Sequence, residues 1–304
     1  MNKYYFYKIY DLILRSEIMF DEYEEIKVHS DIEYDFEILY GVETYDIIRK
    51  KQRGINQNFS LSYIWFYAEN IATYQIIEGK KILVTKDNDC DYETVKAYLI
   101  GTCMGYILFQ KNILAIHGAV VANKDKASII IGDSGSGKST ISMYLQNKGY
   151  GFLSDDIARI FDGDKLCVSS GYPGQRLCED TMEELDFNIK QYRKVHLPNK
   201  NKFLIPIKEN FIDNRIEARF IFEITTKNSG EIEFFHVEGK EKLNIILNNI
   251  YGISRLKFLK KDSNYFKSCI SLAREITVYK IVRPINKNTL RDEANFIDKA
   301  YGLN

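Results

Sequence analysis

The stretch IIIGDSGSGKSTISMYL, residues 129–145, decides the expected fold. In this stretch Gly132, Gly137, Lys138 and Ser139 satisfy the pattern G-x-x-x-x-G-K-S/T. An apolar strand, SIII, precedes the pattern, and a helical stretch that ends at Gly149 follows it. This succession of strand, loop and helix predicts a phosphate-binding loop in an α/β domain.

Each part of this loop has a physical task. Glycines let backbone N–H groups converge on phosphate oxygens, and the helix N-terminus adds positive potential. Lys138 supplies a point charge to the β- and γ-phosphates, and the Ser139 hydroxyl is expected to meet a magnesium ion. Ser136 and Thr140 either assist or cap the helix. The residues expected to contact the nucleotide are Gly132, Asp133, Ser134, Gly135, Ser136, Gly137, Lys138, Ser139 and Thr140. A glycine-rich turn without a ligand is the alternative.

Two acidic residues, Asp155 and Asp156, follow the next predicted strand, YGFLS at 150–154. A short right-handed crossover from the loop unit is expected to bring the ends of the two strands side by side, near Lys138. Successive strand residues point to opposite faces, so one aspartate is expected to face magnesium and the other an acceptor. The alternative is that the pair only marks a turn.

His117 lies on the apolar strand ILAIHGAVVA, residues 113–122, and the turn NKDK leads from there to the loop strand. We expect His117 either to lie beside the phosphates or to orient Asp155, because an ordinary aspartate, with a pKa of about 3.9, is a poor base. A structural role for this histidine is the alternative.

Two basic features lie further along the chain. Arg176 stands in the Pro-Gly turn PGQR and is either solvated or contacts the acceptor or a phosphate. The run KQYRKVHLPNKNK, residues 190–202, is either a surface loop or a flap that closes over the substrates. In the second case Arg193 or Lys202 would reach the transferring phosphate.

Composition limits the class of protein. A chain of 304 residues, 45% of them hydrophobic, suits one or two folded domains. Lys+Arg and Asp+Glu both count 42, so the net charge predicts neither a nucleic-acid nor a membrane partner. Five scattered cysteines without a C-x-x-C pair indicate reduced thiols, and no signal-peptide core or spanning helix is found. We therefore expect a soluble, cytoplasmic protein.

The pattern along the chain predicts two domains and an α+β chain overall. Residues 1–91 alternate Tyr/Phe/Ile-rich segments with charged turns, which is typical of antiparallel strands with one wet face, and EGKK at 78–81 predicts a hairpin turn. Residues 92–304 begin with a helix-like stretch and continue in the α/β manner. Residues 219–226 and 231–238 predict a second hairpin around KNSG, residues 241–259 a helix, and 277–282 and 289–301 a final strand and helix.

Together, HG at 117–118, GDSGSGKS at 132–139 and DD at 155–156 resemble the catalytic domain of HPr serine kinase/phosphorylase, which shares its P-loop arrangement with phosphoenolpyruvate carboxykinases. The run GYPGQRLCEDTMEEL, residues 171–185, looks like one in shorter HPr-kinase-like proteins from gene clusters for ribosomally made peptides, especially lasso peptides. Residues 7–20 are similar to the opening strands of that branch. The resemblance implies a P-loop kinase domain at 92–304.

The resemblance also implies roles. Lys138 and Ser139 would hold phosphate and metal, Asp156 would assist the metal, Asp155 would be the general base, and His117 would support Asp155 or the phosphate. The cofactors implied are ATP and Mg²⁺, and since family relatives include hexamers, a homo-oligomer is one option. The I-R-G-x-G-like run of true HPr kinase/phosphorylases is not found, which argues against HPr as acceptor and against reversal by phosphorolysis.

The leading hypothesis is therefore a kinase that transfers the γ-phosphoryl group of ATP to a serine or threonine hydroxyl of a peptide or small protein. The N-terminal sheet would recognise the acceptor by strand addition. A small-molecule kinase or carboxykinase-like enzyme is one alternative. The other is a switch or scaffold that binds nucleotide without transferring phosphate.

Overall fold

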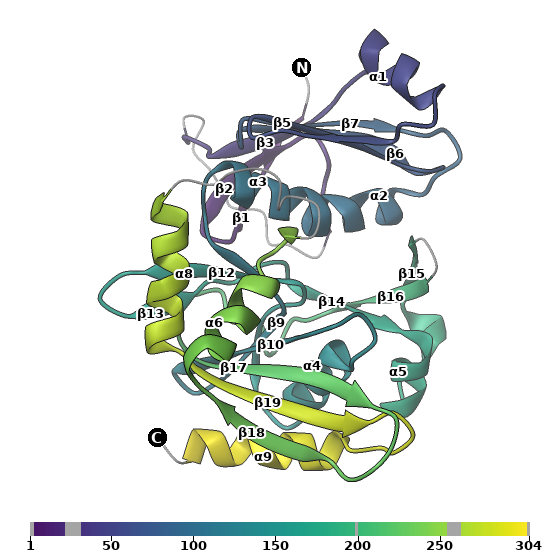
Figure 1. Ribbon diagram of the computed structural model, residues 1–304. Coiled ribbons are helices and arrows are strands. Elements are labelled where there is room, and N and C mark those ends of the chain that lie inside the picture. Colours follow the sequence, from purple (N-terminus) through teal and green to yellow (C-terminus); the bar gives the residue numbers. More distant parts are fainter. Residues whose placement is uncertain (1–2, 22–31, 198–199, 254–262, 303–304) are drawn as a thin grey trace.

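The computed structural model describes residues 3–21, 32–197, 200–253 and 263–302. Within those ranges the strands form three sheets, of seven, nine and three strands, and helices pack between and around them (Figure 1). The first two sheets contain both parallel and antiparallel pairs. The chain is therefore a mixed α/β protein.

The first sheet is built from residues near the N-terminus. Its order is β1 (Tyr5–Ile9), β2 (Leu12–Ser16), β3 (Phe36–Tyr40), β7 (Lys81–Lys86), β6 (Ala72–Ile77), β5 (Tyr63–Ala68) and β4 (Gln57–Phe59), with α1 (Tyr45–Lys51) between β3 and β4 in the chain. The hairpin at 78–81 is confirmed, because Ile77 pairs with Lys81. The all-antiparallel expectation is wrong: β3 runs parallel to both β2 and β7, since long connections rather than tight turns join these strands.

A long helical segment lies beneath the first sheet and faces the rest of the molecule (Figure 1). It comprises α2 (Tyr92–Tyr98), a π-helical turn η1 (Leu99–Cys103) and α3 (Met104–Gln110), which confirms the helix predicted there. Val95, Leu99 and Ile107 are buried in one apolar core with the sheet, and this core also includes Ile157 and Leu204. The sheet and the remainder of the chain therefore share buried contacts, and the division at residue 92 stays a prediction.

The second sheet carries the motif stretch. Its order is β11 (Gly151–Ser154), β9 (Ala119–Asn123), β10 (Lys126–Gly132), β17 (Ile216–Lys227), β13 (Leu166–Val168), β12 (Ile157–Asp162) and β8 (Ala115–His117), while β19 (Thr277–Pro284) pairs with β17 and β18 (Glu233–Val237). Ile129 and Ile131 pack with α6 (Gly239–Asn248) and α8 (Ser263–Glu275). Ile130 packs with α4 (Lys138–Asn147) and α9 (Leu290–Gly302) on the other face. An unbroken apolar strand suits this sheet because both of its faces are buried.

Two predictions for this sheet are wrong. The hairpin around KNSG does not form, because β19 inserts between its two arms, parallel to β17 and antiparallel to β18. The strand predicted at 113–122 is interrupted at Gly118, so that β8 pairs with β12 while β9 pairs with β10 and β11. The final strand and helix are confirmed as β19 and α9. The helix predicted at 241–259 corresponds to α6 at its start, and residues 254–259 lie outside the described part.

The third sheet contains β14 (Gly174–Cys178), β16 (Lys200–Pro206) and β15 (Arg193–Leu197), with α5 (Glu179–Glu184) and the 3₁₀ turn η2 (Ile189–Gln191) between β14 and β15 in the chain. The basic run at 190–202 was expected to be either a surface loop or a flap, but most of it forms the antiparallel pair β15–β16. Val195 and Phe203 of this pair are buried, whereas Arg193 and Lys194 are exposed.

One helical glycine makes a testable contact between the two halves of the molecule. A Cβ placed on Gly105 in α3 would lie 1.9 Å from the ring of Tyr251. We expect Gly105→Ala to lower the free energy of unfolding by about 1–3 kcal/mol through overpacking, although alanine is otherwise the better helix former. Urea unfolding measures this. Gly302→Ala in α9, where a Cβ has open space, is the matched control and is expected to be neutral, and equal behaviour of the two variants would contradict the contact.

Candidate functional site

The motif loop, residues 132–137, joins the C-terminal end of β10 to the start of α4, as the sequence predicts. Gly132, Gly135 and Gly137 have φ angles of 144°, 86° and 105°, which residues other than glycine rarely adopt. The ammonium of Lys138 donates to the carbonyl oxygens of Gly132, at 2.7 Å, and of Asp133, at 2.9 Å. Burial lowers the pKa of Lys138, and the negative charge of Asp156 opposes this shift. The Lys138 side chain therefore folds back onto its own loop, where the negative charges of Asp155 and Asp156 act on its ammonium group.

Polar groups in the first turn of α4 form hydrogen bonds to neighbouring elements. The Thr140 hydroxyl lies 2.9 Å from the Thr181 hydroxyl on α5, and the backbone carbonyl of Ser139 accepts from Gln175 on β14 at 3.1 Å. Gly137 occupies the position before α4 and offers no side-chain cap, so neither Ser136 nor Thr140 caps this helix. These contacts hold the first turn of α4 against α5 and β14.

Asp155 and Asp156 lie at the bend between β11 and β12. β9 separates β11 from β10, so the two strand ends are not adjacent as predicted, but both strands are antiparallel to β9 and therefore end on the same side of the sheet. The Asp155 side chain is buried. Its Oδ2 accepts from the Arg176 backbone N–H at 3.2 Å and from Arg176 Nε at 3.5 Å, whereas its Oδ1 has no hydrogen-bond partner within the described residues.

Both carboxylates of the pair contact the same guanidinium, since Arg176 Nη2 donates to Asp156 Oδ2. The expectation that the two side chains point apart is therefore wrong, because they occupy a bend rather than the regular strand on which it rested. Burial, followed by the charge of Asp156, raises the pKa of Asp155. Burial would also raise the pKa of Asp156, but the positive charges, that of Arg176 first, outweigh burial and lower it. The pair thus combines a more basic and a less basic carboxylate.

Arg176 is not in a solvated turn. It lies in β14, pairs with Leu204 of β16 and is 7% exposed. Besides the two aspartates, Arg176 contacts α2, where its Nη1 donates to the backbone carbonyl of Ala97 at 3.2 Å. The Pro-Gly signal lies at the start of the strand, whose first residue is Gly174, and pairing with β16 extends the backbone at Arg176. Arg176 therefore joins the acidic pair to the helix beneath the first sheet.

His117 lies beside the acidic pair and is half-buried. Its Nδ1 lies 3.1 Å from the backbone carbonyl oxygen of Asp156, and its ring meets that of Tyr251 edge to face at 5.6 Å. Burial lowers the pKa of His117, although the nearby carboxylates oppose this. Its contact with the pair is made through the Asp156 backbone and not through the Asp155 side chain.

Of the two cations of the basic run that were expected to reach the phosphate, Lys202 lies near the site and Arg193 points elsewhere. The charge of Lys202 helps to lower the pKa of both aspartates and of Lys138, which places it within the same electrostatic field. Arg193 contacts Asp21 at 3.2 Å and Glu93 at 3.0 Å. The side chains brought together are those of His117, Lys138, Asp155, Asp156, Arg176 and Lys202.

Three residues near the site carried no signal in the sequence. The Tyr10 hydroxyl, from the β1–β2 turn, lies 3.1 Å from the Ser154 hydroxyl just before the acidic pair. Tyr251 packs on His117, and burial, followed by the charge of Asp156, raises its pKa against the opposing charge of Arg176. Arg283, from β19, donates to the backbone carbonyl of Ser136 at 3.3 Å. Each is far along the chain from its partner, so no spacing rule could have found it.

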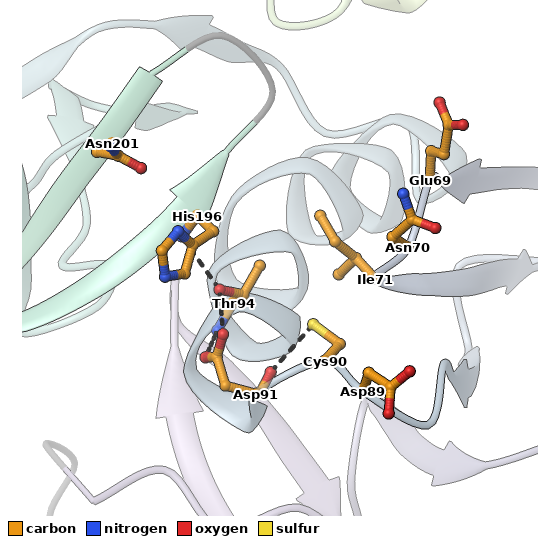
Figure 2. A pocket seen from close by; sticks show the side chains of 9 residues that line it. All are labelled: Glu69, Asn70, Ile71, Asp89, Cys90, Asp91, Thr94, His196 and Asn201. Carbon is orange, nitrogen blue, oxygen red and sulfur yellow. Dashed lines mark hydrogen bonds between the residues drawn. The ribbon is translucent and has the colours of Figure 1, made fainter.

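A cavity of about 480 Å³ lies away from the motif loop (Figure 2). Residues from the first sheet, the segment before α2 and the β15–β16 pair line it. Its hydrogen bonds are structural: Asp91 caps α2 by accepting from the Thr94 backbone N–H at 2.8 Å, and the Thr94 hydroxyl accepts from the His196 backbone N–H at 3.1 Å. These bonds organise the cavity wall and do not point to a ligand, so we locate the candidate site at the motif loop.

The described residues contain no group of three or more His, Cys, Asp or Glu side chains that could hold a metal ion by itself. Nor does any described helix have the length and apolar character needed to cross a membrane. The five cysteines are free thiols.

No protein-family model matches this chain, and no curated protein matches it. Among solved structures, the HPr(Ser) kinase/phosphatase from Coxiella burnetii has a distant similarity to it, with 12% identity and a TM-score of 0.33 over 62% of this chain and 95% of that one.

Proposed function

We propose that this protein is an ATP- and Mg²⁺-dependent kinase that transfers the γ-phosphoryl group to a serine or threonine hydroxyl of a peptide or small protein. The observation that carries the proposal is that the motif loop with Lys138, after β10, and the Asp155–Asp156 pair, after β11, lie on the same side of the sheet, where the charge of Asp156 acts on Lys138. Phosphoryl transfer needs a cradle for phosphates, countercharge and a proton acceptor, and these residues supply all three.

The donor set suits magnesium. Mg²⁺ is usually held by one or two carboxylates together with substrate phosphates and waters, so the absence of a three-acid cluster in the described residues does not conflict with it. The Ser139 hydroxyl and the half-exposed Asp156 carboxylate would hold the ion. Held there, the ion would supply positive charge against the negative charge that develops on the transferring phosphoryl group.

The chain's own groups perform the remaining steps. The backbone N–H groups of the motif loop and the ammonium of Lys138 bind the phosphates, and Lys138 exchanges its two loop carbonyls for phosphate oxygens. Asp155 accepts the proton of the attacking hydroxyl as the new oxygen–phosphorus bond forms and the bond to the departing ADP breaks. Burial suits Asp155 to this task because it raises the pKa of the carboxyl, and Arg176 holds Oδ2 so that Oδ1 is free to accept the proton.

The acceptor class rests on the resemblance of residues 171–185 to a run in the shorter, peptide-modifying HPr-kinase-like proteins. A ribosomally made precursor peptide is therefore the acceptor to test first. The first sheet, which packs on the helix that Arg176 contacts, is proposed to recognise it. We place the reaction in the cytoplasm, where ATP is abundant.

Lys138→Ala tests the phosphate cradle. Loss of charged hydrogen bonds to the phosphates is expected to weaken ATP binding by about one to two powers of ten in Kd and to abolish phosphorylated product. Calorimetry with MgATP measures the first effect, and mass spectrometry of candidate peptides and cell lysate after incubation with ATP the second. Lys148→Ala, at the exposed end of the same helix, is the matched control. Tight ATP binding by wild type with no phosphorylated product in any fraction would instead support the switch.

A further inference from the structure

The turn between β1 and β2 brings a side chain of the first sheet close to the acidic pair. Tyr10, in this turn, is 2% exposed, and its hydroxyl lies 3.1 Å from the Oγ of Ser154, which is 1% exposed. Ser154 ends β11 and directly precedes Asp155. Burial raises the pKa of Tyr10, and the charges of Asp156 and Asp155 act in the same direction. The Tyr10 hydroxyl therefore lies within electrostatic reach of both aspartates.

The backbone of this turn is not one that its residues favour. Ile9 pairs with Leu12, so Tyr10 and Asp11 form a two-residue hairpin turn, and their φ angles are 51° and 57°. Turns with two positive φ angles favour Asn or Asp followed by Gly, and a bulky side chain is uncommon there. Such a backbone persists where surrounding contacts hold it, and it is frequent at functional sites. The contacts around the turn therefore decide its conformation.

Residues outside the first sheet supply most of these contacts. The Tyr10 backbone N–H donates to the Ser170 carbonyl at 2.8 Å, and the Arg159 guanidinium donates to the Tyr10 carbonyl. The Asp11 carboxylate pairs with Arg215. Arg159 lies in β12, and Ser170 and Arg215 lie in the segment between β13 and β14 and just before β17. Both backbone polar groups of Tyr10 are thus satisfied by the half of the chain that carries the motif loop.

A glycine makes room for the tyrosine ring. A Cβ placed on Gly171 would lie 2.6 Å from the Tyr10 ring and 2.7 Å from the Ser154 Oγ. The Gly171 N–H donates to the Leu153 carbonyl at 2.7 Å, so the Gly171 backbone lies against β11. A larger residue at position 171 would push Tyr10 and Ser154 apart. The contact between the two hydroxyls therefore depends on this glycine as well as on the turn.

We propose that Tyr10 is a positioning residue for the acidic pair. Its hydroxyl fixes Ser154, and with it the bend that carries Asp155 and Asp156, so that docking of the first sheet completes the site. Arg176 holds the two carboxylates, whereas Tyr10 holds the backbone that leads to them. The motif loop and the start of α4 are held by α5, β14 and β19 instead. Loss of the Tyr10 hydroxyl should therefore slow the transfer step and leave nucleotide binding unchanged, a consequence that rests on the proposed function.

The first test measures the bend itself, on the full chain without ligand. Tyr10→Phe removes the hydroxyl and keeps the ring, and Ser154→Ala removes its partner. By hydrogen exchange and mass spectrometry, we expect residues 152–158 to exchange about threefold to tenfold faster in each variant, as the loss of one hydrogen bond predicts. The double variant should exchange no faster than the single ones, because both changes remove the same bond.

Tyr7→Phe is the matched control. Tyr7 also lies in the β1–β2 hairpin and is 1% exposed, but its hydroxyl accepts from the Phe20 backbone N–H at 2.9 Å, within the N-terminal part of the chain. Its loss should leave exchange at residues 152–158 as in wild type. Unchanged exchange at the bend in Tyr10→Phe, or equal acceleration in Tyr7→Phe, would overturn the positioning role.

The second test separates kcat from KM. Tyr10→Phe is expected to lower kcat for phosphoryl transfer about threefold to tenfold, while its KM for MgATP stays within about twofold of wild type and Tyr7→Phe changes neither. Faster exchange at the bend without a loss of kcat would leave a merely structural contact and overturn the proposal. Wild-type protein that transfers no phosphate would overturn the proposed function, and exchange at residues 152–158 would still decide whether Tyr10 holds the bend.

Discussion

Asp155→Asn is expected to reduce the rate of phosphoryl transfer about 10²- to 10⁴-fold, the usual contribution of a positioned general base. The amide has nearly the shape of the carboxylate but cannot accept the proton. Because burial raises the pKa of Asp155, the folded protein already disfavours its charge, and the substitution should cost little stability at neutral pH. Single-turnover transfer to the acceptor, followed by mass spectrometry, measures the rate, and calorimetry is expected to find ATP binding almost unchanged.

Asp162→Asn is the matched control for this variant. Asp162 ends β12, the strand that follows the acidic pair, and it is exposed, with a hydrogen bond from the Ser271 hydroxyl at 2.8 Å. It is expected to transfer phosphate at the wild-type rate. Transfer by Asp155→Asn within about threefold of wild type would remove Asp155 as the base. If Asp156→Asn instead lost the rate while keeping its affinity for magnesium, the two aspartates would have the opposite roles.

The local parts of the candidate site could be predicted from the sequence. The β10–loop–α4 unit follows from residues within one short window, because glycine spacing, an apolar strand and a helix start are local signals. The acidic pair was placed correctly at the end of a strand on the same side of the sheet as the loop. The insertion of β9 between β10 and β11 was missed, because strand order depends on pairing between distant segments.

The contacts that were missed and the predictions that were wrong depend on residues far apart in the chain. Arg283 and Ser136 are separated by 147 positions, and Tyr10 and Ser154 by 144, so no periodicity connects them. From its Pro-Gly context Arg176 was expected either to be solvated or to contact the acceptor or a phosphate, yet the side chains that pair with it are Asp155 and Asp156. The hairpin around KNSG failed for a similar reason: β19, which enters from the end of the chain, separates two strands that have the alternation of a hairpin.

Arg176→Ala is expected to lower the free energy of unfolding by about 3–5 kcal/mol, because removing one partner of a buried ion pair leaves uncompensated charge. Arg176 is 7% exposed and contacts both aspartates, so its loss leaves two neighbouring carboxylates in the interior. Arg176→Lys keeps the charge but not the forked geometry, and an intermediate loss is expected. Arg193→Ala is the matched control: its side chain is 55% exposed and pairs with Asp21 and Glu93, so its loss should cost at most about 1 kcal/mol.

The stability loss of Arg176→Ala is also expected to depend on pH, which gives a second test of the same ion pairs. The pKa of Asp156 lies below its ordinary value of 3.8, since the surrounding cations outweigh burial. A carboxyl with a lowered pKa adds stability above its unfolded-state pKa and loses that contribution as the pH falls toward the folded-state value. The difference in unfolding free energy between wild type and Arg176→Ala, measured by urea unfolding, should therefore be largest near neutral pH and shrink below about pH 4.

Adding Asp155→Asn and Asp156→Asn to Arg176→Ala should recover part of the lost stability, because neutral amides need no countercharge. A loss below about 1 kcal/mol at neutral pH, unchanged on acidification, would mean that water rather than Arg176 stabilises the acidic pair.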